Sequence, residues 1–381
     1  MSHETTAFQA RPFAPRYWMF GAGLALLTAC SSPPSESNGS GGGTGEAGTA
    51  GLAKGGGPGA GASGTGAAGD AAGGGAAGQG PDSTRFRSRI SLGGDFGCAI
   101  ASSGTVACWG TPLGGADAIT PPGGQFIALA SGLDLSCGLT SSATVQCWGN
   151  LSGAAATPIP AGLVGTSIGV GVSEQCVITS GTGELACWGA PQAITGTAPT
   201  GTFAQVSLAK NYGCLLTVEG ALTCWGSDAY GQSTPPAGRF VQVASAAYHS
   251  CALRDDGSAQ CWGVGGAGMP TDGGAGATGN DGTESWGQSI APAGKKFKRL
   301  AVGFLHSCGI LESGDIECWG AGTSAGDCKT FATCGQAVSQ PGPFVDLALG
   351  ASNSCGMLES GKIKCWGSNS GGRSTPPADF Q

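Results

Sequence analysis

Residues 248–263 read YHSCALRDDGSAQCWG. Within this stretch, Cys251 and Cys261 stand at equal distances from the three residues 255–257, which end in Gly257. Three-residue hairpin loops favour a left-handed residue in their last position, and glycine adopts that conformation without strain. Pairing outward from such a loop sets Cys251 directly opposite Cys261, at a Cα separation that suits a disulfide. The stretch therefore predicts a β-hairpin that is closed by its own disulfide.

The same pattern occurs seven times along the chain. In each unit the second cysteine is followed by Trp-Gly, and successive units begin about 38 residues apart, with two longer steps near the end. Six of the seven loops end in glycine, and only the second unit departs, with Ala143. The expected disulfides are Cys98–Cys108, Cys137–Cys147, Cys176–Cys187, Cys214–Cys224, Cys251–Cys261, Cys308–Cys318 and Cys355–Cys365.

Each unit contains three or four short stretches with the character of β-strands. In the fifth unit they are residues 240–243, 251–253 and 259–262. A repeat of this size matches one blade of a propeller, and closing the ring removes exposed strand edges. The alternatives are an open β-solenoid or separate hairpins, which would be barely stable alone. We therefore predict an all-β fold, a seven-bladed β-propeller with three- to four-stranded, disulfide-stapled blades over residues 83–381.

The cysteine count indicates the compartment. Of the 17 cysteines, Cys30 stands apart and the others form eight pairs, the eighth being Cys328 and Cys334. An even, regularly spaced set predicts disulfides, which persist in oxidising compartments. A zinc site would need closer ligand gaps and more histidines, since residues 83–381 contain only His249 and His306. We therefore expect an exported protein with no metal and no cofactor.

The N-terminus has the features of an export signal. Arg11 and Arg16 precede the apolar residues 17–27, which are too few to span a bilayer. Residues 27–30, LTAC, resemble the bacterial lipobox, and an ordinary cleaved signal is the alternative. The resemblance implies cleavage before Cys30, acylation of that cysteine and, because Ser31 follows, sorting to the outer membrane. Several acyl chains give durable anchoring.

These features divide the chain into three parts. Residues 1–29 are the expected lipoprotein signal peptide, 30–82 a lipidated cysteine with a Gly/Ala-rich stalk, and 83–381 the seven-repeat propeller. The stalk has no apolar periodicity and is expected to be disordered. As a Gly-rich coil it would span roughly 40 Å. We expect a monomer attached to the membrane through the lipid anchor only, on the outer membrane or cell surface.

The repeat resembles that of the regulator-of-chromosome-condensation superfamily. The residues that carry the resemblance are His249-Ser250, Asp256-Gly257 and Trp262-Gly263, with a trailing Gly231-Gln232. The short period is closer to the bacterial branch typified by β-lactamase inhibitor protein II. The resemblance implies a seven-bladed propeller that binds other proteins. The histidine occurs in only two units, and the other units have Phe96, Leu135, Glu174, Tyr212 and Asn353 at that position.

No catalytic constellation is found in the sequence. His249 and His306 occupy equivalent repeat positions, which favours a structural role. Residues 356–362 match G-x4-G-K but lack the following Ser or Thr and span a hairpin turn. The net charge of −7 argues against nucleic-acid binding, and the basic residues 295–299 are interpreted as a solvated strand edge. We expect a protein that is not an enzyme and binds no nucleic acid.

Two insertions, residues 264–294 and 321–342, are the best candidates for specificity. The candidate binding residues there are Asp272, Asp281, Trp286 and Lys329. A calcium site on the acidic loop is an alternative to an irregular loop. We expect a lipid-anchored binding or scaffold module that recognises an unknown protein or polysaccharide through propeller loops. The alternatives are an envelope polysaccharide lyase or hydrolase that uses the central channel, and an extracytoplasmic enzyme inhibitor.

Overall fold

The computed structural model describes residues 86–111, 119–150, 158–190, 194–266, 285–324, 326, 328 and 332–381. The expected signal peptide, Cys30 and the stalk lie outside these residues. The described residues form seven antiparallel sheets of three strands each, in which consecutive strands are neighbours. Among them, no helix is long and apolar enough to cross a membrane.

The strands follow one another in groups of three along the chain. The first two sheets are β1 (Ile90–Leu92), β2 (Phe96–Ile100), β3 (Val106–Gly110), β4 (Phe126–Ser131), β5 (Leu135–Thr140) and β6 (Val145–Gly149). The next three are β7 (Gly165–Val170), β8 (Glu174–Thr179), β9 (Leu185–Gly189), β10 (Phe203–Leu208), β11 (Tyr212–Thr217), β12 (Leu222–Gly226), β13 (Phe240–Ala246), β14 (His249–Arg254) and β15 (Ala259–Gly263). The last two are β16 (Phe297–Val302), β17 (His306–Leu311), β18 (Ile316–Gly320), β19 (Phe344–Leu349), β20 (Asn353–Leu358) and β21 (Ile363–Gly367).

The predicted hairpin register is confirmed in every sheet. Cys251 lies opposite Cys261 between β14 and β15, and the corresponding cysteines face each other in the other six sheets. All seven pairs form disulfides with Cα separations of 4.0 or 4.1 Å. Gly257 has φ 82° at the end of its loop, and Ala143 holds the same left-handed position with φ 64°. The loop geometry therefore persists even where glycine is missing.

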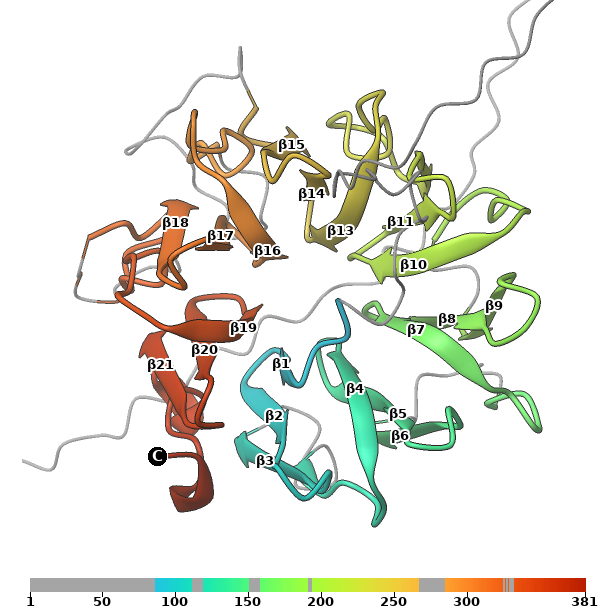
Figure 1. Cartoon of the computed structure of the whole chain (residues 1–381), viewed down its shortest axis with the longest axis horizontal. Coiled ribbons are helices and arrows are strands. Elements are labelled where there is room, and N and C mark those ends of the chain that lie inside the picture. The colour runs from blue at the N-terminus through green and yellow to red at the C-terminus, as the bar shows by residue number, and fades with distance from the viewer. Residues whose placement is uncertain are drawn as a thin grey trace, which may run out of the picture. The chain divides into compact units, whose positions relative to one another are not determined.

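The seven sheets form a closed ring in which the first strand of each is innermost (Figure 1). Each of these inner strands contacts the next around the ring, and β19 contacts β1. Apolar side chains fill the spaces between neighbouring sheets, as where Phe203, Val206 and Leu215 pack against Ile178. The described body is therefore a β-propeller, and its blades have three strands. We number the blades 1 to 7 in chain order.

The C-terminal residues close the ring between blades 7 and 1. They contain two short 3-10 helices, η2 (Ser370–Gly372) and η3 (Ala378–Phe380). The Arg373 guanidinium lies 2.6 Å from a carboxylate oxygen of Asp95 in blade 1. The Trp109 indole of blade 1 donates to the carbonyl oxygen of Arg373 at 2.8 Å, and Phe380 packs into the core shared by the two blades. A half-buried ion pair, a hydrogen bond and the packing of one aromatic ring thus close the ring without a covalent bond.

Candidate functional site

The repeat motif forms a hydrogen-bonded clamp between blades. The hydroxyl of Ser307 in blade 6 donates to the carbonyl oxygen of Gln288 at 3.0 Å, and the Trp319 indole donates to the same oxygen at 2.9 Å. The His249 ring of blade 5 bonds the Ser307 oxygen through Nε2 at 3.0 Å. Because the Ser307 hydrogen is used on Gln288, His249 is the donor in this pair. The equivalent clamp at the next boundary consists of His306, Ser354, Gln336 and Trp366.

Burial keeps both clamp histidines neutral. His249 and His306 are fully buried, and the loss of hydration lowers the pKa of each imidazole to about 3. Tyr212 occupies the equivalent position in blade 4, and its hydroxyl contacts the carbonyl oxygen of His249 and the Ser250 hydroxyl. These side chains are engaged in contacts between blades.

Glu174 differs from the other polar residues at this repeat position, Tyr212, His249, His306 and Asn353, which all form hydrogen bonds. Its side chain is buried, and one carboxylate oxygen has no hydrogen-bond partner among the described residues. The next blade has Gly213 where the clamps have serine. Burial raises the pKa of the Glu174 carboxyl to about 7. A carboxylate oxygen lies near the sulfurs of Cys176 and Cys187, but those sulfurs are joined in a disulfide and are not available as thiolate ligands.

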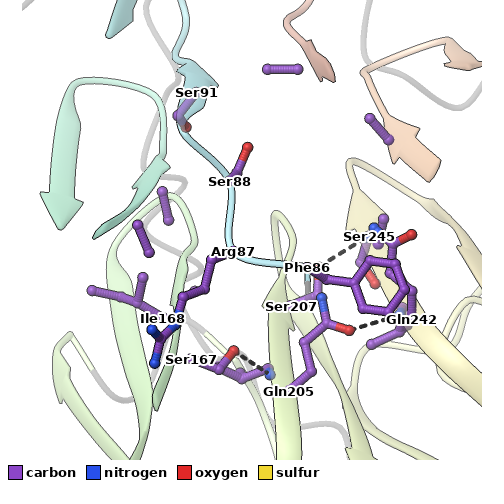
Figure 2. Close-up of a pocket in the computed structure, with 18 of the residues that line it drawn as sticks. Phe86, Arg87, Ser88, Ser91, Ser167, Ile168, Gln205, Ser207, Gln242 and Ser245 are labelled. Carbon is purple, nitrogen blue, oxygen red and sulfur yellow. Dashed lines mark hydrogen bonds between the residues drawn. The ribbon is translucent and has the colours of Figure 1, made fainter. Parts of the chain in front are cut away.

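A cavity of about 220 Å³, which we call the axial cavity, lies among the inner strands of the ring (Figure 2). Its walls come from the first strands of all seven blades and from residues 86–88, which precede β1. Among the described lining residues, the only charged ones are Arg87 and Arg299. The cavity is therefore electropositive although the whole chain carries a net charge of −7.

The segment that precedes β1 ties several blades together across this cavity. The Nε of Arg87 donates to the Thr166 carbonyl oxygen in blade 3 at 3.3 Å. The backbone nitrogen of Arg89 donates to the Asp346 carboxylate in blade 7 at 2.6 Å. Asp346 also forms an ion pair of 2.8 Å with Arg299, which lies in blade 6. The prediction of a solvated strand edge is therefore wrong for Arg299, because this pairing draws its side chain into the interior.

One face of the ring consists of the turns between the first and second strands of the blades, and we call it the turn face. Its residues are 93–95, 132–134, 171–173, 209–211, 247–248, 303–305 and 350–352. Two neighbouring pairs of turns are joined by backbone hydrogen bonds, since Gly94 N donates to Leu133 O at 3.0 Å and Phe304 N donates to Gly350 O at 3.2 Å. Other turns are bonded within their own blade, as where Ser227 N donates to Asn211 O at 3.0 Å.

The turn face exposes apolar side chains and little charge. Leu133 and Val172 project from adjacent blades with 43% and 46% of their surfaces exposed. Further round, the Lys210 ammonium donates to the Tyr248 hydroxyl at 2.7 Å, and Tyr230 packs edge-on against Tyr248. The opposite face consists of the turns between second and third strands and is mainly acidic, although Asp256 pairs with Lys296 and Lys362 is exposed there. Its exposed carboxylates are Glu184, Glu219, Asp255, Asp256, Glu312 and Glu359.

The predicted insertion residues are only partly described. Asp272, Asp281 and Lys329 lie outside the described residues. The half-buried Trp286 packs against Leu305, Ala321 and Ala332 beside the turn face. Cys328 and Cys334 form the eighth disulfide. Eight disulfides in one chain indicate an extracytoplasmic location.

Comparisons with known proteins agree with this geometry. Residues 240–268 and 344–373 match the model of the regulator of chromosome condensation (RCC1) repeat. These segments contain all three strands of blades 5 and 7, including the Trp-Gly motif of each third strand. No curated protein is similar to the chain in sequence at a significant level.

Several solved structures share the fold. The ectodomain of the receptor kinase CR4 from Physcomitrella patens is 22% identical with a TM-score of 0.55, over 74% of this chain and 73% of that one. The CRINKLY WD40 ectodomain of ACR4 from Arabidopsis thaliana is 22% identical with a TM-score of 0.55, over 76% and 98%. Prp20p from Saccharomyces cerevisiae is 17% identical with a TM-score of 0.52, over 68% and 80%. The described body therefore has the fold of an RCC1-like propeller, whereas the closer similarity to the bacterial branch stays a prediction.

Proposed function

We propose that this protein is a rigid, lipid-anchored binding module that contacts a protein partner through its turn face. The observation that carries the proposal is the contrast between the two faces. Exposed aliphatic groups on a nearly uncharged surface, such as Leu133 and Val172, are typical of protein interfaces. The Asp95 carboxylate on the turn face is paired with Arg373. Burial, together with the negative charge of Asp95, raises the pKa of the neighbouring Asp134 carboxyl.

Rigidity supports this assignment. A disulfide joins the second and third strands of every blade, and backbone hydrogen bonds join two neighbouring pairs of turns on the turn face. A surface that is already ordered loses little conformational entropy on binding, so more of the contact energy remains as affinity. Binding residues are commonly carried on loops that a rigid scaffold positions, and the turn face has that organisation.

A pair of matched variants tests the choice of face. Leu133→Glu with Val172→Glu places charge on the turn face, whereas Val218→Glu makes the same type of change at an exposed valine in a turn of the opposite face. Capture from envelope extract, read by quantitative mass spectrometry, is expected to lose the partner with the first variant and to retain it with the second. Loss with Val218→Glu and retention with the double variant would place the site on the opposite face.

The lipid anchor at Cys30 is the second part of the proposal. It rests on the lipobox-like residues 27–30 and on the extracytoplasmic location that the disulfides indicate. Cys30→Ser is expected to move the protein from the membrane fraction to the soluble fraction while the propeller stays folded. A variant that remains in the membrane fraction after a high-salt wash would contradict the anchor.

A glycan-active enzyme on this scaffold has less support. Such chemistry generally needs a pair of carboxyl groups on either side of the scissile bond. The described residues that line the axial cavity include no carboxylate and no imidazole. We therefore keep the binding role as the proposal.

A further inference from the structure

The wall of the axial cavity has hydrogen-bond donors left over. Three of its polar side chains each accept a bond from a backbone N–H of the next inner strand. These bonds are Val206 N to Ser167 Oγ at 3.2 Å, Val243 N to Gln205 Oε1 at 2.9 Å and Ser245 N to Ser207 Oγ at 2.9 Å (Figure 2). A hydroxyl that accepts a hydrogen bond can still donate its own hydrogen. A side-chain amide whose oxygen accepts a hydrogen bond can still donate through its NH₂ group. No described residue accepts a hydrogen bond from these three groups.

Gln242 shows that not every polar side chain of the cavity wall has a donor without an acceptor. Its amide nitrogen donates to the Leu300 carbonyl oxygen at 2.8 Å, and its amide oxygen accepts from Leu300 N at 2.8 Å. Both ends of that side chain are therefore satisfied. The donors of Ser167, Gln205 and Ser207 lie on neighbouring blades 3 and 4 and line the same side of the cavity.

Arg87 adds a positive charge on this side. Its side chain extends toward Ser167 and Ile168 (Figure 2). Its Nε bonds the Thr166 carbonyl oxygen, and within the described part of the chain no carboxylate forms an ion pair with its guanidinium. Arg299, the other charged lining residue, is neutralised by Asp346. The cavity thus combines one uncompensated guanidinium with several free donors, an arrangement that favours an anion.

The size and the remaining walls favour an organic anion. An apolar cavity of about 150 Å³ is large enough to hold benzene. The cavity here is about 220 Å³, and its lining includes aliphatic side chains such as Ile168, Val206 and Leu208. A guanidinium matches the planar geometry of a carboxylate. We infer that the axial cavity is a binding site for a small organic carboxylate with a ring-sized apolar body, held by Arg87 with Ser167, Gln205 and Ser207. This site is independent of the proposed function of the turn face.

Benzoate is the probe for this site, used with the purified full chain in titration calorimetry and ligand-observed NMR. Arg87→Gln is expected to weaken benzoate binding about tenfold or more, because it removes a charge-assisted hydrogen bond. Arg89→Gln is the matched control, since its guanidinium bonds the Ile100 carbonyl oxygen and does not line the cavity. It should bind benzoate like the wild type, and both variants should keep the wild-type circular dichroism spectrum.

A second variant tests the donor argument. Gln205→Glu keeps an oxygen that accepts from Val243 N but replaces the NH₂ donor with a carboxylate, so benzoate binding should be lost while the fold is retained. Benzyl alcohol should bind much more weakly than benzoate, and sulfate should not displace benzoate at equal concentration. The inference fails if benzoate does not bind, if Arg87→Gln and Arg89→Gln bind it alike, or if sulfate binds in its place.

Discussion

At the scale of single residues, Glu174 makes stability depend on pH. Its folded-state pKa of about 7 lies above its ordinary value of 4.5. Folding therefore favours the protonated carboxyl, and the stability that this provides is complete below about pH 4.5 and is lost as the pH rises through 7. Glu174→Gln should increase the free energy of unfolding at pH 8 by about 1–3 kcal/mol, since each pKa unit corresponds to about 1.4 kcal/mol. Urea unfolding at two pH values measures this.

The same comparison at pH 5 is the control. His249 and His306 have pKa values lowered from 6.5 to about 3, so stability falls in both proteins as the pH drops below 6.5. Because the two proteins share these histidines, their difference isolates Glu174, and it should shrink at pH 5. A difference that is the same at pH 5 and pH 8 would mean that Glu174 is not the titrating group.

Ala143 provides a second test at this scale. It adopts φ 64°, a left-handed conformation that costs a residue with a Cβ atom about 1–2 kcal/mol. Ala143→Gly should therefore raise the free energy of unfolding by about 0.5–1 kcal/mol, part of the gain being offset by the greater entropy of the unfolded chain. Gly257→Ala, at φ 82°, should lower it. Calorimetric melting of both variants checks the pair, and a lower melting temperature for Ala143→Gly would contradict the loop assignment.

At the scale of the structural element, the unit that matters is the clamp between blades. Ser307→Ala removes the oxygen that His249 bonds and one of the two donors to Gln288 O. Leaving a buried imidazole N–H unpaired should destabilise the protein by about 1–3 kcal/mol. Denaturant unfolding should show this as a lower midpoint with an unchanged slope.

Ser136→Ala is the matched control for the clamp. Ser136 holds the same repeat position in blade 2, but the preceding blade has Phe96 there, which has no polar atom to bond it. Its hydroxyl instead contacts that of Ser131 at 2.8 Å. Ser136→Ala should therefore lower the free energy of unfolding by less than Ser307→Ala does. Equal losses would indicate that the hydrogen bond from His249 contributes little.

The hairpins were predictable from sequence, whereas the clamps were not. Equal spacing around a turn glycine is a local pattern, so Cys251, Gly257 and Cys261 together determine the register of their hairpin. The clamp joins residues from two blades and the connection between them, and no local pattern gives that geometry. A usable signal exists, because Gly-Gln at residues 231–232 recurs at 287–288 and 335–336, and each of these glutamines is buried.

At the scale of the whole molecule, the least predictable features lie where distant segments meet. Arg299 looks like part of an exposed basic run, and only the ring brings it to Asp346 and to the segment at Arg89. Closure by the C-terminal residues is equally non-local. The Trp109 indole of blade 1 donates to the carbonyl oxygen of Arg373, whereas the equivalent Trp319 of blade 6 donates to Gln288, which lies in the connection just before that blade. The axial cavity and its positive charge also arise from such contacts between segments that are distant in the sequence.

The ring, the turn face and the extracytoplasmic location all depend on one claim, that each blade is closed by its own disulfide. The most direct test is disulfide mapping of the protein from envelopes that have been treated with an alkylating agent, by non-reducing proteolysis and mass spectrometry. Seven links within hairpins and a Cys328–Cys334 link are expected, with none of these sixteen cysteines alkylated. Links that join two blades, or alkylated cysteines within the hairpins, would contradict the claim.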